Sequence, residues 1–261
     1  MGKGNNIKYG YILDSKISAL SFSQTIQVIE DWIRQKKSEY VCVCNTHSLV
    51  TASNEIFFKN VLEQAGICTP DGMPLVWALK LNGFKQQDRV DGPNLMLKLC
   101  ELSSKKGYKI FLYGNKQETL DKLENKLTSM YEGLQIVGKY SPPFRELTKE
   151  ELIEIRKIIN SSNPDLIFVS LGCPKQEIWM YNNREHIKGI MLGVGAAFDF
   201  ITGDLKRPPL FIQKLGLEWL FRLISEPRRL WKRYAYNNTM FIYKFLKTYK
   251  KNKIRTQLEN S

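Results

Sequence analysis

The chain has 261 residues, of which 43% are hydrophobic and 25% are charged, and a formal net charge of +13. These values are ordinary for a folded protein with one large domain, or with one domain and an appendage. No run approaches the roughly 18 to 20 consecutive apolar residues that cross a bilayer, and residues 1–11 lack the apolar core of a secretion signal. Both facts argue against a membrane-spanning or secreted protein, and a cytoplasmic location is expected.

Short β-branched and apolar runs alternate with helical patterns through most of the chain. A strand is predicted at 40–44, a helix at 53–64, and a second short strand at 67–69 that stops at a Pro-Asp-Gly turn. This alternation favours an α/β fold, a Rossmann-like parallel sheet flanked by helices. The further predicted strands are 110–113, 134–137, 166–171 and 190–194, and the further predicted helices are 74–81, 93–105, 117–130 and 148–159.

The cysteines give no sign of a metal site. They are five in number and scattered, which agrees with a cytoplasmic location. Cys42 and Cys44 alternate with valines in a strand-like run, so we expect them to be small buried residues. Because no second Cys/His pair lies at ligand spacing, no bound metal is predicted.

Nearly all of the positive charge lies in the last fifth of the chain. Residues 205–261 contain 14 Lys and Arg but only 3 Asp and Glu. The composition shifts at about Lys206, and we predict an α/β core over residues 1–205 and a basic, aromatic, helical appendage over residues 206–261. Aromatic rings settle at the headgroup level of a bilayer, and each cation near anionic lipid contributes about 1 kcal/mol. An anionic membrane surface is therefore an expected partner.

Two stretches of the appendage have helical patterns. Residues 216–224 have an apolar spacing that suits packing on the core and completing a pocket. Residues 240–249 are aromatic and basic, which suits a helix that lies in the membrane interface. The alternatives are core packing alone for the first stretch, and an oligomer contact or a solvated end for the second.

Glycine or polar side chains follow several of the predicted strands. In a parallel sheet, ligands bind at the carboxyl ends of the strands, where the strand order reverses. The sequence therefore predicts a site for a polar ligand, built from the segments that follow strands, at 45–47, 71–72, 114–115, 172–177 and 195–199.

Asp71 is the strongest candidate for a general base. It lies in a Thr-Pro-Asp-Gly turn at a strand end. A carboxylate there can accept a proton from a substrate hydroxyl, which typically contributes about 10²- to 10⁴-fold to a rate. The alternative is a turn aspartate that bonds its own backbone, and local sequence alone favours that alternative.

Three other residues are candidates for substrate binding. Arg89 precedes a helix and has the two-pronged geometry that suits a diphosphate, although a surface ion pair with Asp88 or Asp91 is an equal alternative. Asn45 and Gln176 follow strand ends and suit sugar hydroxyls or a uracil edge. Either of them is equally suited to bonding the loop backbone.

Two other classes of protein are less well supported. Residues 193–197 resemble a dinucleotide fingerprint, but the third glycine and a clear helix start are missing, which disfavours a dehydrogenase. A nucleic-acid-binding module that uses the basic, aromatic tail is the main rival. Because the charge lies on an appendage and the strand ends suit a sugar nucleotide, no nucleic-acid partner is expected.

Five parts of the sequence resemble the WecG/TagA/CpsF glycosyltransferases in order and spacing, over roughly residues 40–234. The resemblance implies an inverting, metal-independent enzyme without a cofactor. Such an enzyme moves N-acetylmannosamine or another hexose or hexosamine from a UDP-sugar to a sugar on undecaprenyl diphosphate, in teichoic acid, capsule or exopolysaccharide synthesis. It acts peripherally at the inner face of the cell membrane, and whether it forms a homo-oligomer is left open. The parts that carry the resemblance are Asn45, 69–76, 89–93, 172–177 and 193–234.

The resemblance also implies roles for single residues. Asp71 matches the base that deprotonates the acceptor hydroxyl. Val43 stands where the family often has Thr, so either Thr46 or His47 is a candidate for the lost polar contact, or the transferred sugar differs. In the absence of an Asp-X-Asp triplet, arginines and backbone amides must stabilise the leaving group. The residues matched to donor or diphosphate binding are Asn45, Arg89 and Gln176, and the tail arginines expected to close over the site are among Arg222, Arg228, Arg229 and Arg233.

Overall fold

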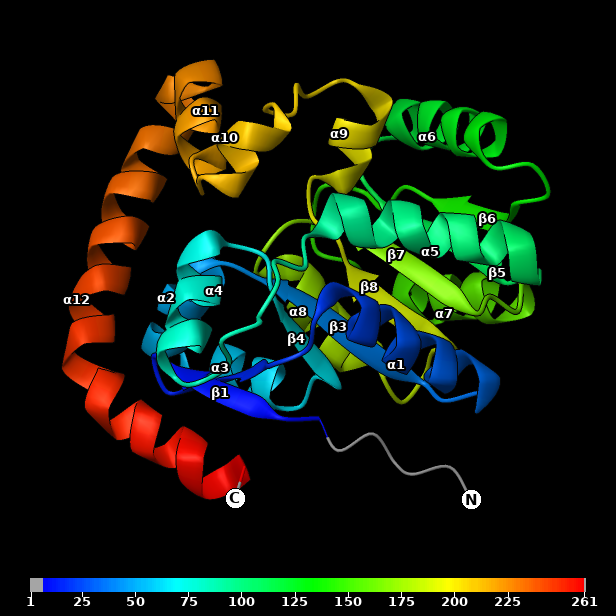
Figure 1. Ribbon diagram of the computed structural model, residues 1–261. Helices are drawn as coiled ribbons and strands as arrows, with labels where there is room; N and C mark the ends of the chain where they lie inside the picture. Colours follow the sequence, from blue (N-terminus) through cyan, green and yellow to red (C-terminus); the bar gives the residue numbers. More distant parts are fainter. Residues whose placement is uncertain (1–6, 261) are drawn as a thin grey trace. The chain divides into compact units, whose positions relative to one another are not determined.

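The computed structural model describes residues 7–260 and has an α/β fold (Figure 1), as predicted. A six-stranded parallel sheet has the order β4-β3-β8-β7-β5-β6. The strands are short runs of mostly apolar residues, and every residue of β7 and β8 is buried, as expected for strands covered on both faces. The strands are β3 (Glu39–Cys44), β4 (Ile67–Pro70), β5 (Lys109–Gly114), β6 (Gln135–Tyr140), β7 (Leu166–Ser170) and β8 (Ile190–Gly193).

The chain folds as two compact units. Of the described residues, the first consists of 7–23, 43–91 and 206–260, and the second consists of 24–42 and 92–205. Residues from 206 onward thus share a unit with residues 43–91, and the division into a core domain and an appendage stays a prediction. In the described range, 7–260, no helix combines the length and the apolar character that spanning a bilayer demands.

Within the described residues, the first unit contains β4, the end of β3, an antiparallel hairpin and six helices. The hairpin pairs β1 (Tyr9–Ile12) with β2 (Ser15–Ser18) through a two-residue turn. Both turn residues, Leu13 and Asp14, have positive φ (50° and 59°), the geometry of the turns that match strand twist. The helices are α2 (Thr46–Asn54), α3 (Ile56–Glu63), α4 (Met73–Leu81), α10 (Leu210–Lys214), α11 (Glu218–Ser225) and α12 (Pro227–Asn260).

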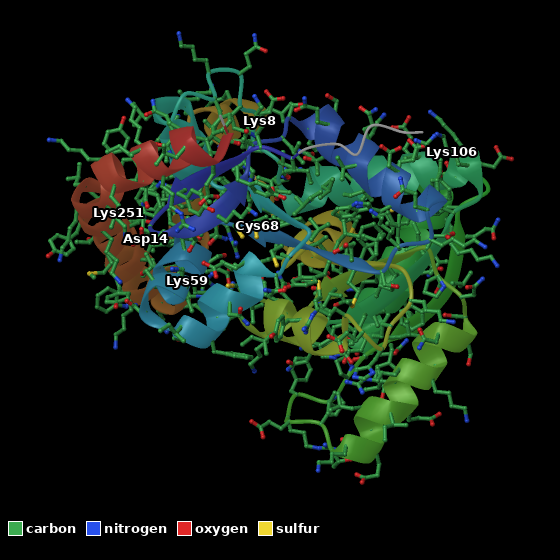
Figure 2. The ribbon with its side chains drawn as sticks, turned by 90° about the horizontal axis from the view of Figure 1, so that it is seen from below. Lys8, Asp14, Lys59, Cys68, Lys106 and Lys251 are labelled. Atoms are coloured by element: carbon green, nitrogen blue, oxygen red, sulfur yellow. The ribbon has the colours of Figure 1, made fainter. Side chains whose placement is uncertain are left out.

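The last helix, α12, is one continuous helix of 34 residues that packs on β1 and α2 (Figure 1). It covers the free edge of the hairpin with polar side chains. Thr256 Oγ1 accepts a hydrogen bond of 3.0 Å from Tyr11 N–H, and the Asn260 amide bonds both backbone groups of Tyr9 (3.1 and 2.7 Å). Figure 2 shows Lys251 beside Asp14, with which it forms an ion pair of 3.1 Å. Strand β1 would otherwise have an edge with backbone groups open to pairing, and α12 covers that edge.

The second unit supplies the remaining strands of the sheet and the helices α5 to α9, together with most of α1. Helix α7 begins with a capping box, in which Thr148 and Glu151 each bond the other's backbone N–H. These helices are α1 (Phe22–Arg34), α5 (Gly92–Lys106), α6 (Gln117–Met130), α7 (Lys149–Ser161), α8 (Lys175–Asn183) and α9 (Ala197–Thr202).

Some elements differ from the sequence prediction. The helix expected at 53–64 is two helices, because Glu55 is extended (φ −123°, ψ 107°) and Asn45 caps an earlier start. A helix does follow Gly195, namely α9, although its N-cap residue makes no side-chain hydrogen bond. The hairpin β1–β2 and the helices α1 and α8 were not predicted. The stretch 240–249 is helical as expected, and it is the middle of α12.

Gly216 joins α10 to α11 with a left-handed backbone (φ +75°), and a Cβ there would lie 2.9 Å from Met73 Cβ. Gly216→Ala is therefore expected to lower the free energy of unfolding by about 2 to 4 kcal/mol, because strain and overpacking add. Gly203→Ala is the matched control, since Gly203 has φ +89° but open space around it. It should cost only about 1 to 2 kcal/mol. Equal losses in urea unfolding would show that the Met73 contact is unimportant.

Candidate active site

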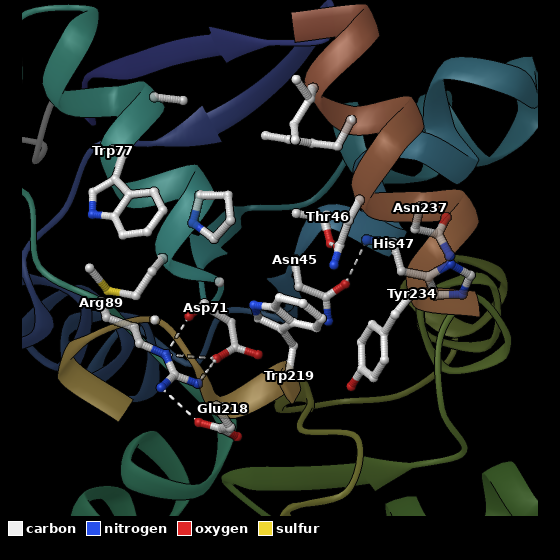
Figure 3. Close-up of a pocket in the computed structure, with 18 of the residues that line it drawn as sticks. Asn45, Thr46, His47, Asp71, Trp77, Arg89, Glu218, Trp219, Tyr234 and Asn237 are labelled. Carbon is white, nitrogen blue, oxygen red and sulfur yellow. Dashed lines mark hydrogen bonds and ion pairs between the residues drawn. The ribbon is translucent and has the colours of Figure 1, made fainter. Parts of the chain in front are cut away.

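A cavity of about 440 Å³ lies within the first unit (Figure 3), and this volume is typical of a small-molecule site. Its walls come from the segment after β3, the turn after β4, and the helices α4, α11 and α12. The N-termini of α2 and α4 both reach it and contribute positive partial charge. Its polar lining residues are Asn45, Thr46, His47, Asp71, Arg89, Gln213, Glu218, Arg222, Arg233, Asn237 and Asn238.

Asp71 is fixed at the end of β4 by backbone pairing. Its N–H donates to Cys44 O at the end of β3 (2.8 Å), so the carboxyl ends of these neighbouring strands meet. The side chain is 23% exposed and lines the cavity. The carboxylate thus lines a cavity at the end of its strand, and its role as a general base stays a prediction.

Arg89 bridges two carboxylates of the cavity. The guanidinium lies 2.8 Å (Nη2) and 3.2 Å (Nε) from Asp71 Oδ1, and Nε also donates to the Asp71 backbone carbonyl. On its other side, Nη1 lies 2.8 Å from Glu218 Oε2 of α11. Figure 3 shows the three side chains together. The sequence had offered an ion pair of Arg89 with Asp88 or Asp91 as the alternative. The structure pairs Arg89 with Asp71 and Glu218, and Asp91 pairs with Arg207 at 2.7 Å.

Backbone bonds beside β4 place Arg89. Val90 N–H donates to Pro70 O (3.1 Å), and the Thr69 hydroxyl donates to Val90 O (3.0 Å). The segment around Arg89 therefore runs alongside the end of β4, and the guanidinium meets the Asp71 carboxylate across that short pairing.

The pKa of Asp71 is unusual for an aspartate. Burial raises it from the ordinary 3.8 to about 6; Arg89 opposes the rise, while Asp91 and Glu218 add to it. Although burial alone would lower the pKa of Arg89, the carboxylates of Asp71, Glu218 and Asp91 raise it, so the guanidinium stays charged. A carboxylate with a pKa near 6 is mostly ionised at neutral pH yet basic enough to accept a proton.

Glu218→Gln is expected to lower the pKa of Asp71, because a negative charge that disfavours its ionisation is removed. The acid limb of the kcat/KM profile should then move below its wild-type position, at about pH 6, with the opposite limb unchanged. Glu226→Gln is the control, since Glu226 pairs with Arg229 and does not line the cavity as described. A shift to higher pH in Glu218→Gln would contradict the expected influence of Glu218.

Asn45 and Thr46 hold the start of α2 at the cavity. Asn45 Oδ1 accepts hydrogen bonds from His47 N–H (3.0 Å) and Ser48 N–H (3.3 Å), so the side chain is the N-cap of α2. Thr46 Oγ1 lies 3.4 Å from Asn238 Oδ1 of α12. The structure thus brings both residues into the cavity with Asp71 and Arg89, and their roles in binding stay predictions.

The predicted tail arginines divide into two groups. Arg222 and Arg233 line the cavity. Arg228 and Arg229 are exposed and are not among the lining residues of the described chain, and Arg229 pairs with Glu226 at 2.7 Å. In this conformation, Arg222 and Arg233 are therefore the tail arginines that lie at the site, and their role in binding stays a prediction.

Gln176 belongs to the second unit and does not line this cavity as described. Its side chain is buried, accepts a hydrogen bond from Gly195 N–H (3.1 Å) and donates one to Glu177 Oε1 (2.9 Å). These bonds match the alternative that Gln176 holds loop backbone, while its predicted contact with the donor stays a prediction.

Sequence reasoning missed several lining residues, because they come from helices rather than strand ends. Glu218 and Trp219 were missed, although they share one face of α11 with the predicted Arg222, and a face of this kind was a signal in the sequence. The other missed residues on α4 and α12 include Trp77, Ala78, Leu81, Tyr234, Asn237, Asn238, Phe241, Ile242 and Phe245.

Comparison with known proteins assigns the chain to a family. Residues 11–255 match the model of the glycosyl transferase WecG/TagA/CpsF family. The chain belongs to this family. The resemblance inferred from sequence motifs is thereby confirmed, and the protein is a glycosyltransferase of the hexosyltransferase type.

Two curated relatives in the family have the same printed function. Both are named N-acetylglucosaminyldiphosphoundecaprenol N-acetyl-beta-D-mannosaminyltransferase. The protein from Bacillus subtilis (strain 168) is 32% identical over 203 residues, which cover 77% of either chain. The protein from Bacillus spizizenii (strain ATCC 23059 / NRRL B-14472 / W23) is 30% identical over 203 residues, again 77% of either chain.

Proposed function

We propose that this glycosyltransferase moves N-acetylmannosamine, or a related hexose or hexosamine, from a UDP-sugar to a sugar on undecaprenyl diphosphate. The observation that carries the proposal is the Asp71 carboxylate, held by Arg89 at the end of β4 in a cavity of about 440 Å³. The names of the two relatives supply the acceptor and the first candidate for the transferred sugar.

The reaction is a single in-line displacement with inversion and without a metal ion. Asp71 accepts the proton of the acceptor hydroxyl, whose oxygen forms a bond to C1 of the donor sugar. The bond from C1 to the UDP oxygen breaks, and UDP leaves from the opposite face. Arg89, Arg222 and Arg233 neutralise the charge that grows on the leaving diphosphate, and they act strongly because a cavity excludes water.

A transfer assay tests the proposal. The enzyme is offered a panel of UDP-sugars with N-acetylglucosamine linked through diphosphate to a short lipid chain. We expect transfer from UDP-N-acetylmannosamine or a related donor, with inverted anomeric configuration and with no effect of chelators. A product with retained configuration, or activity that a chelator removes and a metal restores, would refute the mechanism. Transfer of no sugar at all would refute the function.

The proposed acceptor lies in a membrane, and the first unit has a surface suited to one. Exposed apolar side chains on α10, α11 and the start of α12 lie among exposed cations such as Arg228 and Lys232. Apolar groups and cations together favour binding to an anionic lipid surface. To bind a nucleic acid, the protein would need stacking and hydrogen-bonding groups in a row along the bound strand. The apolar members are Leu210, Phe211, Leu215, Ile224 and Trp231.

Phe211→Ser is expected to weaken sedimentation with anionic vesicles several-fold, because the ring is 64% exposed and would enter the lipid interface. Phe144→Ser in the second unit is the matched control, since that ring is 85% exposed but lies outside the proposed surface. High salt should weaken vesicle binding by the full chain. Equal effects of the two variants, or tighter binding to oligonucleotides than to vesicles, would contradict the membrane role.

A further inference from the structure

The cavity has a polar end and an apolar end. Asp71, Arg89 and Glu218 gather at the start of α4, and Figure 3 shows Trp77 further along that helix. The lining beyond this point comes from two helices and is apolar apart from the indole N–H of Trp77. It consists of Trp77, Ala78 and Leu81 of α4 and of Phe241, Ile242 and Phe245 of α12.

The apolar end is a groove between α4 and α12. Tyr249 of α12 donates a hydrogen bond of 3.2 Å to Leu81 O, so the end of α4 lies against α12. From Trp77 to Leu81 the groove follows α4 for about 6 Å at 1.5 Å per residue. Phe241 and Phe245 stack with ring centroids 6.0 Å apart and form part of its wall.

The lining chemistry limits what this groove binds. A diphosphate is charged, and a sugar or a nucleoside has polar groups around its edge, so burying any of them without hydrogen bonds is unfavourable. A hydrocarbon chain has no such groups. Trp77, Leu81 and Ile242 are 49%, 53% and 60% exposed, so a chain in the groove would remove substantial apolar surface from water.

We propose that this groove binds the hydrocarbon chain of a lipid-diphosphate acceptor, at the end that carries the diphosphate. The inference rests on the proposed function, because it names the acceptor of the same cavity. The order of groups along the cavity matches the order within such a molecule. The attacking sugar lies at Asp71 in the polar end, and the chain continues past Trp77 toward Leu81 in the apolar end. An undecaprenyl chain is much longer than the groove, so only its first part is held.

Binding of two diphosphates without membranes tests the groove. Farnesyl diphosphate and methyl diphosphate are titrated into the full chain by calorimetry, in vesicle-free buffer and below the concentration at which the farnesyl compound aggregates. The wild-type protein is expected to bind farnesyl diphosphate at least about tenfold more tightly. Equal affinities for the two compounds would overturn the proposal.

Two double variants test whether the lining of the groove causes the preference for farnesyl diphosphate. The double variant L81N/I242N should lose the preference for farnesyl diphosphate and keep its affinity for methyl diphosphate. The control is Y243N/L246N, because these residues are 59% and 72% exposed on α12 and do not line the cavity as described. An equal loss of the farnesyl preference in the control would overturn the proposal that the groove binds the chain. If L81N/I242N fails to fold, I242N alone should lower the preference, and an unchanged preference would overturn the proposal equally.

The transfer assay separates this inference from the proposed function. A farnesyl preference that depends on Leu81 and Ile242, found together with no sugar transfer, would support the groove and refute the transfer reaction. Sugar transfer to a farnesyl-linked acceptor, without any preference of the groove for the farnesyl chain, would refute the groove alone.

Discussion

Asp71→Asn is expected to lower kcat by about 10²- to 10⁴-fold, because the amide cannot accept the proton of the acceptor hydroxyl. UDP binding should change little, since the amide oxygen can still accept hydrogen bonds from Arg89, which lies 2.8 Å from the carboxylate. Steady-state transfer and UDP titration check both expectations. Asp88→Asn is the matched control, because Asp88 is exposed and does not line the cavity as described. Equal turnover of Asp71→Asn and wild type would remove Asp71 from the mechanism.

The same variant should be at least as stable as the wild type above pH 6. The folded-state pKa of Asp71, about 6, exceeds the ordinary 3.8. Between these values the folded state binds more protons than the unfolded state, so the contribution of Asp71 to stability falls as pH rises through this window. Ionised Asp71 therefore costs on the order of 1 to 3 kcal/mol at neutral pH. Urea unfolding of the variant and the wild type at pH 4 and pH 8 measures this difference in stability. It also shows whether lost turnover in the variant comes from lost chemistry or from lost folding.

The half of the site that follows strands was predictable from sequence. The strands β3 and β4 are short buried runs, so the positions of Asn45 and Asp71 follow from the rule that ligands bind at strand ends. The partner of Arg89 was not predictable locally. The run Asp88-Arg89-Val90-Asp91 suits a surface ion pair, and only the pairing of Val90 with Pro70 turns the guanidinium toward Asp71.

The half that comes from the tail depends on contacts over long separations. Glu218 lies 129 positions from Arg89, and no local pattern connects the two. The hairpin β1–β2 was missed for a related reason. Its turn is Leu13-Asp14 rather than a pair with glycine or asparagine, and Leu13 is buried, so packing selects a residue that the turn alone would not.

The tail also shows how one stretch of sequence serves two surfaces. The middle of α12 was expected to be a membrane helix because it is aromatic and basic. In the structure, Phe241 is buried and lines the cavity, while Tyr243 and Leu246 on the same helix are exposed. Composition alone cannot separate these faces, whereas a 3.6-residue period can, because it divides the aromatic residues between two sides of the helix.

Arg89→Gln is expected to lower kcat/KM at neutral pH by about 10²-fold or more, through two effects of one lost charge. The diphosphate loses a charged, two-pronged partner in a cavity where such contacts are strong. The carboxyl of Asp71 also loses the cation that opposes its rise in pKa, while Asp91 and Glu218 remain. The acid limb of the pH profile should therefore move above pH 6, the reverse of its movement in Glu218→Gln.

The double variant R89Q/E218Q separates these two effects. Removing Glu218 together with Arg89 takes away one of the two charges left near Asp71, so the acid limb should return part of the way toward its wild-type position. The loss of diphosphate binding should not recover, because no guanidinium is restored. The two shifts of the acid limb should thus have opposite signs and partly cancel, whereas UDP affinity should stay as low as in R89Q. If the acid limb is the same in R89Q and R89Q/E218Q, then Glu218 does not act on Asp71 electrostatically, and its contact with Arg89 serves only to hold α11 at the cavity.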